Sequence, residues 1–401
     1  MKPLHLKGAA TLAVVALVGI GYQTAMGSEG APKQPSPAAA TAWKVSHHSE
    51  SLSAEMTDVA PVSADEGWAI GTSQGDDGSG EVEHVLLHRA GEEWKKSALP
   101  EGARDGAVYQ IEASSPDNVW LFGEGGPGEG KPFAFRWDGE QWKPVDGPPS
   151  INLWGTRPAT VLGPDDVWVL DGGQMGVAHH WNGSKWTDTE LPAKATSVGG
   201  SSGDDVWAVG YRDTEDDGGS MSQPAAMHWD GKAWKLAETP EYNFPDPAPP
   251  EETASLESVV AVSEDEVWAV GSHTFNHGEG GPEPEEESIL LRWDGAEWKE
   301  APAAAADKAT MEAASDGAGG LVLSRSAHMT AAGDVREITK HDPVPGRSGK
   351  VEEVDKKQKF WPTETALVPG TRQVWSSGVI ELGAHGDANF RRAAVLSYDT
   401  E

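Results

Sequence analysis

Acidic side chains alternate with other residues in one segment of this 401-residue chain. Asp213, Glu215 and Asp217 are separated by single residues, and a glycine follows them. Alternating oxygen ligands before a glycine are typical of a calcium loop, because this spacing lets successive side chains converge on one ion. The closing ligands are missing, since Met221 and Pro224 stand at the ninth and twelfth positions. The segment therefore predicts either a calcium site or a solvated acidic loop.

Two histidines, His273 and His277, are four residues apart. On a helix this spacing would align two metal ligands. The glycines and the asparagine around His277 predict a loop, in which the spacing aligns nothing. A structural or solvent role is therefore favoured over metal binding.

The chain contains no recognisable set of nucleophile, base and orienting group. The segment 199–203 fits a nucleophile elbow, Gly-x-Ser-x-Gly, but it falls in a turn between two predicted strands. The elbow requires a strand-to-helix turn. The absence of cysteine also excludes thiol chemistry.

A repeated pattern predicts the elements that position these residues. The sequence Trp-Asp/Asn-Gly-x-x-Trp occurs at 137–142, 181–186, 229–234 and 293–298. Asp-Gly and Asn-Gly tolerate positive φ at both central turn positions, so each copy predicts a hairpin between two strands. A second half of the repeat, a polar turn followed by an alternating apolar run, predicts another hairpin. It contains Trp120, Trp168, Trp207 and Trp268. Each repeat therefore has four antiparallel strands, a to d, with the polar turn between a and b and the Asp-Gly or Asn-Gly turn between c and d.

Weaker copies extend the pattern toward both ends of the chain. Trp68 opens the first copy, Leu321 occupies the strand-b position of a degenerate one, and Trp375 marks the last. The mean spacing of these positions is roughly 51 residues, as in four-stranded blade repeats. The last copy has a strand c but no strand d after it. The segment "TAWKVSHH" around Trp43, before the first copy, is predicted to supply that missing strand d.

These counts predict an all-β fold, a seven-bladed β-propeller of four-stranded antiparallel blades, closed by an N-terminal strand that completes the last blade. Such closure removes exposed sheet edges. The segment 342–361 could instead be a long loop, and a six-bladed ring with an insertion is the alternative.

Residues 1–27 have the features of a secretory signal peptide. Lys2 and Lys7 precede an apolar run that ends at Ile20, and Ala25 and Gly27 form a small-x-small cleavage site. Residues 28–41 are a Pro/Ala-rich linker, and residues 42–401 form the propeller. We predict a secreted, extracellular protein, without membrane insertion beyond the signal. A membrane-tethered protein with an uncleaved signal is the alternative.

The formal net charge of −33 makes nucleic acid an implausible partner. An acidic surface is expected to keep an exported protein soluble and monomeric. Attraction to cations or to a basic partner is the alternative reading of the same charge.

The repeats resemble those of the kelch and galactose-oxidase-like β-propellers, and specifically the Trp-rich secreted propellers of actinobacteria, over residues 42–401. The period and the paired aromatics of strands c and d carry the resemblance, while the double glycine of kelch strand b is missing. The copper-radical oxidases of that superfamily use a thioether-linked Cys–Tyr cofactor, and this chain has no cysteine. The resemblance therefore implies the fold and no activity.

Histidine and arginine interchange before the strand-c tryptophan of different repeats. His180 and His228 occupy the position that Arg136 and Arg292 take in sister copies. This interchange predicts a positive edge that stacks on a neighbouring tryptophan.

Function is expected on the face formed by the b–c and d–a loops, because these loops are long and the other turns short. We predict a ligand site between the fourth and fifth blades. The candidate ligand-binding residues are Tyr211, Asp213, Asp216, Tyr242, His273 and His277, and those for a metal are Asp213, Glu215 and Asp217.

The favoured function is a secreted non-catalytic binding or interaction module for an extracellular protein or saccharide, with no cofactor other than possible calcium. The alternative is an extracellular carbohydrate-active enzyme, a glycoside hydrolase or lyase that uses two loop carboxylates from different blades. Asp213, Asp216 and Asp246 are candidates for that role, and the sequence does not choose among them.

Overall fold

The computed structural model describes residues 42–400 except 75–80, 126–129, 153–156, 174, 215–220, 247–248, 250, 277–283 and 386–387. The chain divides into two compact units, Met1–Ala39 and Ala40–Glu401. The account below concerns the second unit. The predicted signal and linker, and the candidate residues Glu215, Asp216, Asp217 and His277, lie outside the described residues.

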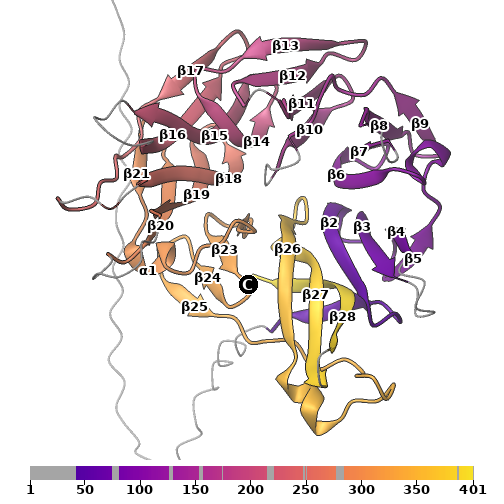
Figure 1. Ribbon diagram of the computed structural model, residues 1–401. Coiled ribbons are helices and arrows are strands. Elements are labelled where there is room, and N and C mark those ends of the chain that lie inside the picture. Colours follow the sequence, from indigo (N-terminus) through magenta and orange to yellow (C-terminus); the bar gives the residue numbers. More distant parts are fainter. Residues whose placement is uncertain are drawn as a thin grey trace, which may run out of the picture. The chain divides into compact units, whose positions relative to one another are not determined.

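Antiparallel strands form five four-stranded sheets and one eight-stranded sheet among the described residues (Figure 1). The first two sheets contain β2 (Ala54–Ser63), β3 (Glu66–Gln74), β4 (Val82–Ala90) and β5 (Glu93–Ser97), then β6 (Ala107–Ser115), β7 (Asn118–Glu124), β8 (Pro132–Trp137) and β9 (Trp142–Val145). The third contains β10 (Ala159–Gly163), β11 (Asp166–Leu170), β12 (Val177–Trp181) and β13 (Trp186–Glu190). The predicted four-stranded antiparallel blades are thereby confirmed.

The eight-stranded sheet consists of two sets of four strands. Its strands are β14 (Lys194–Ser202), β15 (Asp205–Thr214), β16 (Met221–Trp229), β17 (Trp234–Ala237), β18 (Thr253–Ser263), β19 (Glu266–Thr274), β20 (Glu287–Trp293) and β21 (Trp298–Glu300). One parallel residue pair, Ser222 with Thr253, connects β16 to β18. Within each set the pairing is antiparallel, as in the other sheets.

The degenerate repeat also forms a sheet, although its strands are short. It contains β22 (Ala314–Ser315), β23 (Leu321–Ser324), β24 (Ala327–Met329) and β25 (Val335–Glu337), so the placement of Leu321 in a second strand is confirmed. The alternative of a long loop at 342–361 in place of strands is met only up to residue 358, because Lys359 begins β26. Between β25 and β26 the chain contains no strand, and the short 3-10 helix η2 (Glu353–Lys357) lies within this connection.

An N-terminal strand completes the last sheet, as predicted. That sheet contains β26 (Lys359–Leu367), β27 (Gln373–His385), β28 (Ala388–Asp399) and β1 (Lys44–His48), and β1 pairs antiparallel with β28. The first strands of successive sets, β2, β6, β10, β14, β18, β22 and β26, contact one another in that order. The series closes because β26 also contacts β2. Figure 1 shows the sheets following one another around a common centre.

The tryptophans of the repeat pack neighbouring sheets together. Trp68 of β3 lies with its ring centroid 5.1 Å from that of Trp137 and 5.2 Å from that of Trp142, both in the next sheet. The last and first sheets pack together in the same way, because the ring centroids of Trp375 and Trp94 are 5.4 Å apart. A buried tryptophan removes about 150–250 Å² from water. At about 25 cal/mol/Å² this is an upper bound of several kcal/mol for each ring.

The hairpin turns form where the Asp-Gly and Asn-Gly pairs predict them, but only the glycine has positive φ, and four residues separate paired tryptophans such as Trp137 and Trp142. The turn glycines have φ between 80° and 94°; they are Gly139, Gly183, Gly231 and Gly295. The preceding side chain fixes the turn, as where Asp138 Oδ1 accepts the N–H groups of Glu140 and Gln141. Two further short helices, η1 (Glu101–Ala103) and α1 (Ala303–Ala306), lie in connections. Across the part of the chain that is described, no helix has the length and apolarity to cross a membrane.

Candidate functional site

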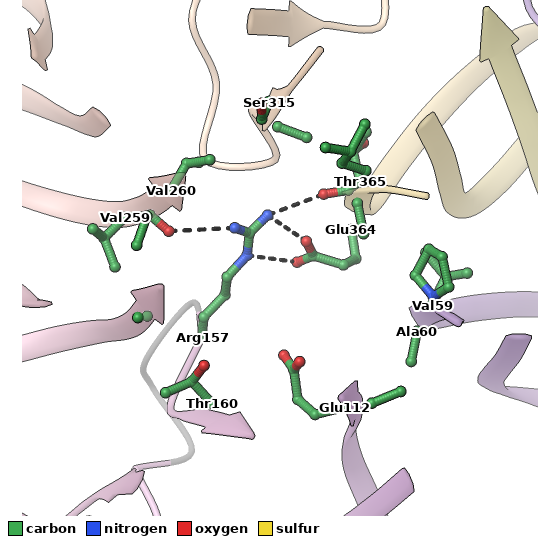
Figure 2. Close-up of a pocket in the computed structure, with 18 of the residues that line it drawn as sticks. Val59, Ala60, Glu112, Arg157, Thr160, Val259, Val260, Ser315, Glu364 and Thr365 are labelled. Atoms are coloured by element: carbon green, nitrogen blue, oxygen red, sulfur yellow. Dashed lines mark hydrogen bonds and ion pairs between the residues drawn. The ribbon is translucent and has the colours of Figure 1, made fainter. Parts of the chain in front are cut away.

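A cavity of about 340 Å³ lies where the first strands of the sets converge. Its walls include apolar side chains, among them Val59, Val198, Val259 and Leu367. Four charged residues stand out against this lining: Asp58 of β2, Glu112 of β6, Glu364 of β26, and Arg157, which precedes β10. Figure 2 shows Arg157 and Glu364 facing each other, with Glu112 nearby.

Arg157 and Glu364 form a two-point ion pair across the cavity. Arg157 Nε donates to Glu364 Oε2 at 3.2 Å, and Arg157 Nη2 donates to Glu364 Oε1. The two side chains are only 16% and 13% exposed. Bidentate pairing of a guanidinium with a carboxylate fixes the orientation of both groups. Both oxygens of Glu364 are therefore occupied by Arg157.

The remaining donors of Arg157 reach backbone carbonyls of other strand sets. Nη1 donates to Val259 O in β18 at 3.4 Å (Figure 2). Nη2 donates to Thr365 O at 3.1 Å and to Ala313 O, next to β22, at 3.4 Å. One side chain from the start of the third sheet thus connects three other strand sets at the centre of the unit.

Two further carboxyl groups in the cavity accept hydrogen bonds from residues of β2 and β6. Asp58 is buried; its Oδ1 accepts the N–H of Val59 at 2.7 Å and its Oδ2 accepts that of Ile111 at 2.8 Å. Glu112 Oε1 accepts a hydrogen bond of 2.8 Å from Gln110 Nε2. Gln110 also pairs with both backbone groups of Ala159, which joins β6 to β10.

The environment favours the protonated form of the carboxyl groups. Burial, reinforced by the negative charge of Glu364, raises the pKa of Glu112 to about 7. Burial, with repulsion from Glu364 and Glu112, raises the pKa of Asp58 well above its usual range. Burial also raises the pKa of Glu364, although Arg157 opposes that effect. Three carboxyl groups thus share one cation, and the group can exchange a proton near neutral pH.

Two of the predicted loop residues meet at a lysine. The ammonium of Lys194 lies 5.0 Å from the ring centroid of Tyr211 and 2.7 Å from Asp213 Oδ2. Asp213 is largely exposed. Among the residues that the structure describes, no group of three or more His, Cys, Asp or Glu is arranged to hold a metal ion. The calcium hypothesis depends on Glu215 and Asp217, which are not described, and it stays a prediction.

Two other predicted residues, Tyr242 and His273, lie together in a packed cluster. Their ring centroids are 5.8 Å apart, and Phe244 stacks on His273 at 3.8 Å. His273 is 1% exposed, and its Nε2 pairs with Glu252 Oε1 at 2.8 Å. The same carboxylate oxygen accepts the N–H of Phe244 at 2.7 Å. His273 therefore connects Phe244 and Glu252 to β19 and does not face solvent.

The histidines before the strand-c tryptophans stack as predicted. His180 lies parallel to Trp168 at 4.1 Å between centroids, and His228 lies over Trp207 at 4.5 Å. In a sister sheet Arg292 takes this place over Trp268. Each histidine also pairs with an aspartate at the start of the second strand, His180 with Asp166 and His228 with Asp205.

The charged residues of the central cavity were not among the residues predicted from the sequence, because that prediction placed function on the long loops. Glu112 and Glu364 are acidic residues in the interior of first strands, and Arg157 immediately precedes a proline. The sequence feature that could have revealed this site is a charged residue on the first strand of a blade, at a position that faces the centre of the ring. Its significance depends on the closure of the ring, which brings strands separated by about 200 residues together.

Neither a protein-family model nor a curated protein matches the chain. Among solved structures, the chain is similar to the β-propeller domain of the Trilobed protease from Pyrococcus furiosus, with TM-score 0.53, 11% identity, and coverage of 87% of this chain and 96% of that one. It is also similar to the SapL1 lectin solved with α-methyl fucoside (TM-score 0.41, 11% identity, 86% and 97% coverage). A further similar structure is a GH74 xyloglucanase from Xanthomonas campestris (TM-score 0.40, 11% identity, 87% and 60% coverage).

The likeness to the β-propeller domain of the Trilobed protease, together with the observed sheets, defines the class of protein by fold alone: the chain is an all-β propeller with four-stranded antiparallel blades. The narrower resemblance to kelch and galactose-oxidase-like propellers stays a prediction.

Proposed function

We propose that this protein is a secreted, non-catalytic binding propeller of seven blades whose central cavity holds a small organic cation, an amino sugar included. The blade number follows if the two halves of the eight-stranded sheet are counted separately. The single parallel pair between β16 and β18 and the closed series of seven first strands support that count.

The observation that carries the ligand proposal is the spare carboxyl group of Glu112. Its Oε1 accepts a hydrogen bond from Gln110, whereas its Oε2 has no hydrogen-bond partner among the described residues. Arg157 is already engaged by Glu364 and by backbone carbonyls. A cation that reaches Glu112 would supply the missing donor and the missing positive charge.

The same arrangement weighs against the carbohydrate-active enzyme. A two-carboxylate mechanism needs a second carboxylate that is free to act as base or nucleophile. Both oxygens of Glu364 are bound by Arg157, and the loop acids Asp213 and Asp246 are exposed. One observation still favours the enzyme, namely that a carboxyl pKa of about 7 for Glu112 suits a general acid.

Thermal melting of the full chain with small amines tests the proposal. Glucosamine should raise the melting temperature more than glucose, because the two differ by the ammonium group. A ligand at about 100 times its dissociation constant adds roughly 2.7 kcal/mol. The effect should be stronger at pH 7 than at pH 5.5, because Glu112 becomes ionised as the pH approaches its raised pKa of about 7, while the ammonium group of the probe is still largely protonated at pH 7.

The matched variants are Glu112→Gln and Glu140→Gln, the latter in an exposed turn. Loss of the amine effect in the first variant alone supports the site. Equal shifts with glucosamine and glucose, or an effect that survives Glu112→Gln, would overturn it. Turnover of an oligosaccharide that disappears in Glu112→Gln would establish the enzyme instead.

A further inference from the structure

A second cavity, of about 620 Å³, lies beside β25 and the beginning of β26. Its walls are formed by Trp43, the turn between β23 and β24, residues 337–341 and residues 358–360. Small-molecule sites generally have volumes of about 300–1,000 Å³. The cavity is built from the degenerate sheet, the long connection that follows it and the residue preceding β1, so it has no counterpart in the regular repeats.

The wall of this cavity is basic, in contrast to the rest of the chain. It contains Arg325, Lys340 and Lys359 but a single acid, Glu337. Neither Arg325 nor Lys359 forms an ion pair with any described residue. Acidic residues outnumber basic ones by 64 to 31 in this protein, so acidic partners are abundant. Two unpaired cations in one cavity therefore provide positive charge for a ligand.

An exposed tryptophan orients these cations. The guanidinium carbon of Arg325 lies 3.9 Å from the ring centroid of Trp361, and Lys359 Nζ lies 5.9 Å from it. Trp361 is 41% exposed, and its Nε1 donates to Glu381 at 2.9 Å, which fixes the ring. A guanidinium that lies over an aromatic ring keeps its N–H donors at its edge, where they match a carboxylate.

The wall also contains an acceptor that lacks a donor. His341 is 4% exposed, and its Nδ1 donates to Asp342 O at 2.7 Å. Burial lowers the pKa of His341, so the ring is neutral and Nε2 carries a lone pair. Nε2 has no hydrogen-bond partner among the described residues. A hydroxyl group, or a water molecule that a ligand orders, would satisfy it.

We propose that this cavity binds a sugar acid, a small organic anion that carries a carboxylate and several hydroxyl groups. The carboxylate pairs with Arg325 and Lys359, and a hydroxyl group supplies the donor that His341 lacks. The apolar face of the sugar ring packs against Phe360 and Ile338, which line the same wall. The proposal is independent of the central cavity, because the two sites share no residue.

Titration calorimetry on the full chain tests this site with glucuronate, glucose and sulfate as probes. Glucuronate should bind at least tenfold more tightly than glucose, which lacks the charge, and than sulfate, which lacks the ring. Binding should weaken with added salt, since the pairing is electrostatic. Trp361 fluorescence should respond to glucuronate in the wild-type chain and not in Trp361→Phe.

Two variants of the cavity and one control complete the test. Arg325→Gln and Lys359→Gln should each weaken glucuronate binding at least tenfold, whereas Lys185→Gln, in an exposed turn of another sheet, should not. The two cations are replaced in separate variants. If the melting curve shows that one variant is misfolded, the other variant still tests the proposal. Equal affinity for glucuronate and glucose, preference for sulfate, or full affinity in a folded Arg325→Gln variant would overturn the proposal.

Discussion

Arg157 reaches across the ring to Glu364, 207 residues away in the sequence, and binds both oxygens of its carboxylate. The pair lies between the third and last sheets, and Arg157 also contacts a carbonyl in β18 and one next to β22. A charge pair at this depth is stable only while both partners are present.

Arg157→Met should be strongly destabilising, because it leaves Glu364 buried without a counter-ion. A loss of about 3–5 kcal/mol is typical when one partner of a buried pair is removed. Urea unfolding of the variant at pH 7 measures it. The double variant Arg157→Met/Glu364→Gln should recover part of the loss, since no buried charge then remains. A double variant no more stable than the single one would show that the charge is not the cause.

The pKa of Glu112 predicts how stability changes with pH. The folded protein raises this pKa from 4.5 to about 7. Between these values the native state holds a proton that the unfolded state has released, so the contribution of Glu112 is fully present below about pH 4.5. It is lost as pH rises through 7. The upper bound is roughly 3 kcal/mol, by the conversion of a pKa difference into free energy.

The check on Glu112 is a comparison of pH profiles. The free energy of unfolding of the wild-type chain is measured from pH 5 to 8, together with that of Glu112→Gln. The variant should lack the decline that Glu112 causes, because glutamine does not titrate. Identical profiles for the two proteins would contradict the raised pKa.

Trp375→Leu should cost about 2–4 kcal/mol, somewhat less than the roughly 3–5 kcal/mol that is typical when a buried tryptophan is truncated to alanine. Trp375 is 1% exposed and packs on Trp94 of the first sheet, so the change weakens the contact that closes the series of sheets. Trp361→Leu is the matched control, because Trp361 is 41% exposed and should change stability far less. Chemical denaturation compares the two, and equal effects would argue against packing as the source.

Removal of residues 1–48 should destabilise the ring and promote aggregation. This deletion removes β1, exposes the edge of β28, and breaks the pair between Lys44 and Asp399. Removal of residues 1–41 retains β1 and should leave the melting temperature unchanged. Size-exclusion chromatography and thermal melts of both proteins provide the measurement. A monomeric, equally stable protein from the longer deletion would show that β1 does not close the sheet.

The sequence by itself determined the local structure of this protein. The Asp-Gly and Asn-Gly pairs specify hairpins through the backbone freedom of residues such as Gly183, and the tryptophan spacing gives the strand pattern. Even the degenerate repeat was recognisable, because Leu321 keeps its place in the period. Four-stranded units and their order follow from contacts close in sequence, which is why the pattern reveals them.

Only the tertiary structure decided which charges meet. Asp58, Glu112 and Glu364 lie in three different sheets and Arg157 precedes the first strand of a fourth, and no local pattern connects them. Likewise His273 is a candidate ligand in the sequence but a buried partner of Glu252 in the fold. The repeat pattern shows where each residue lies within its own blade. The pKa and the partners of a central residue depend instead on the closure of the ring, because closure brings distant strands into one poorly solvated space.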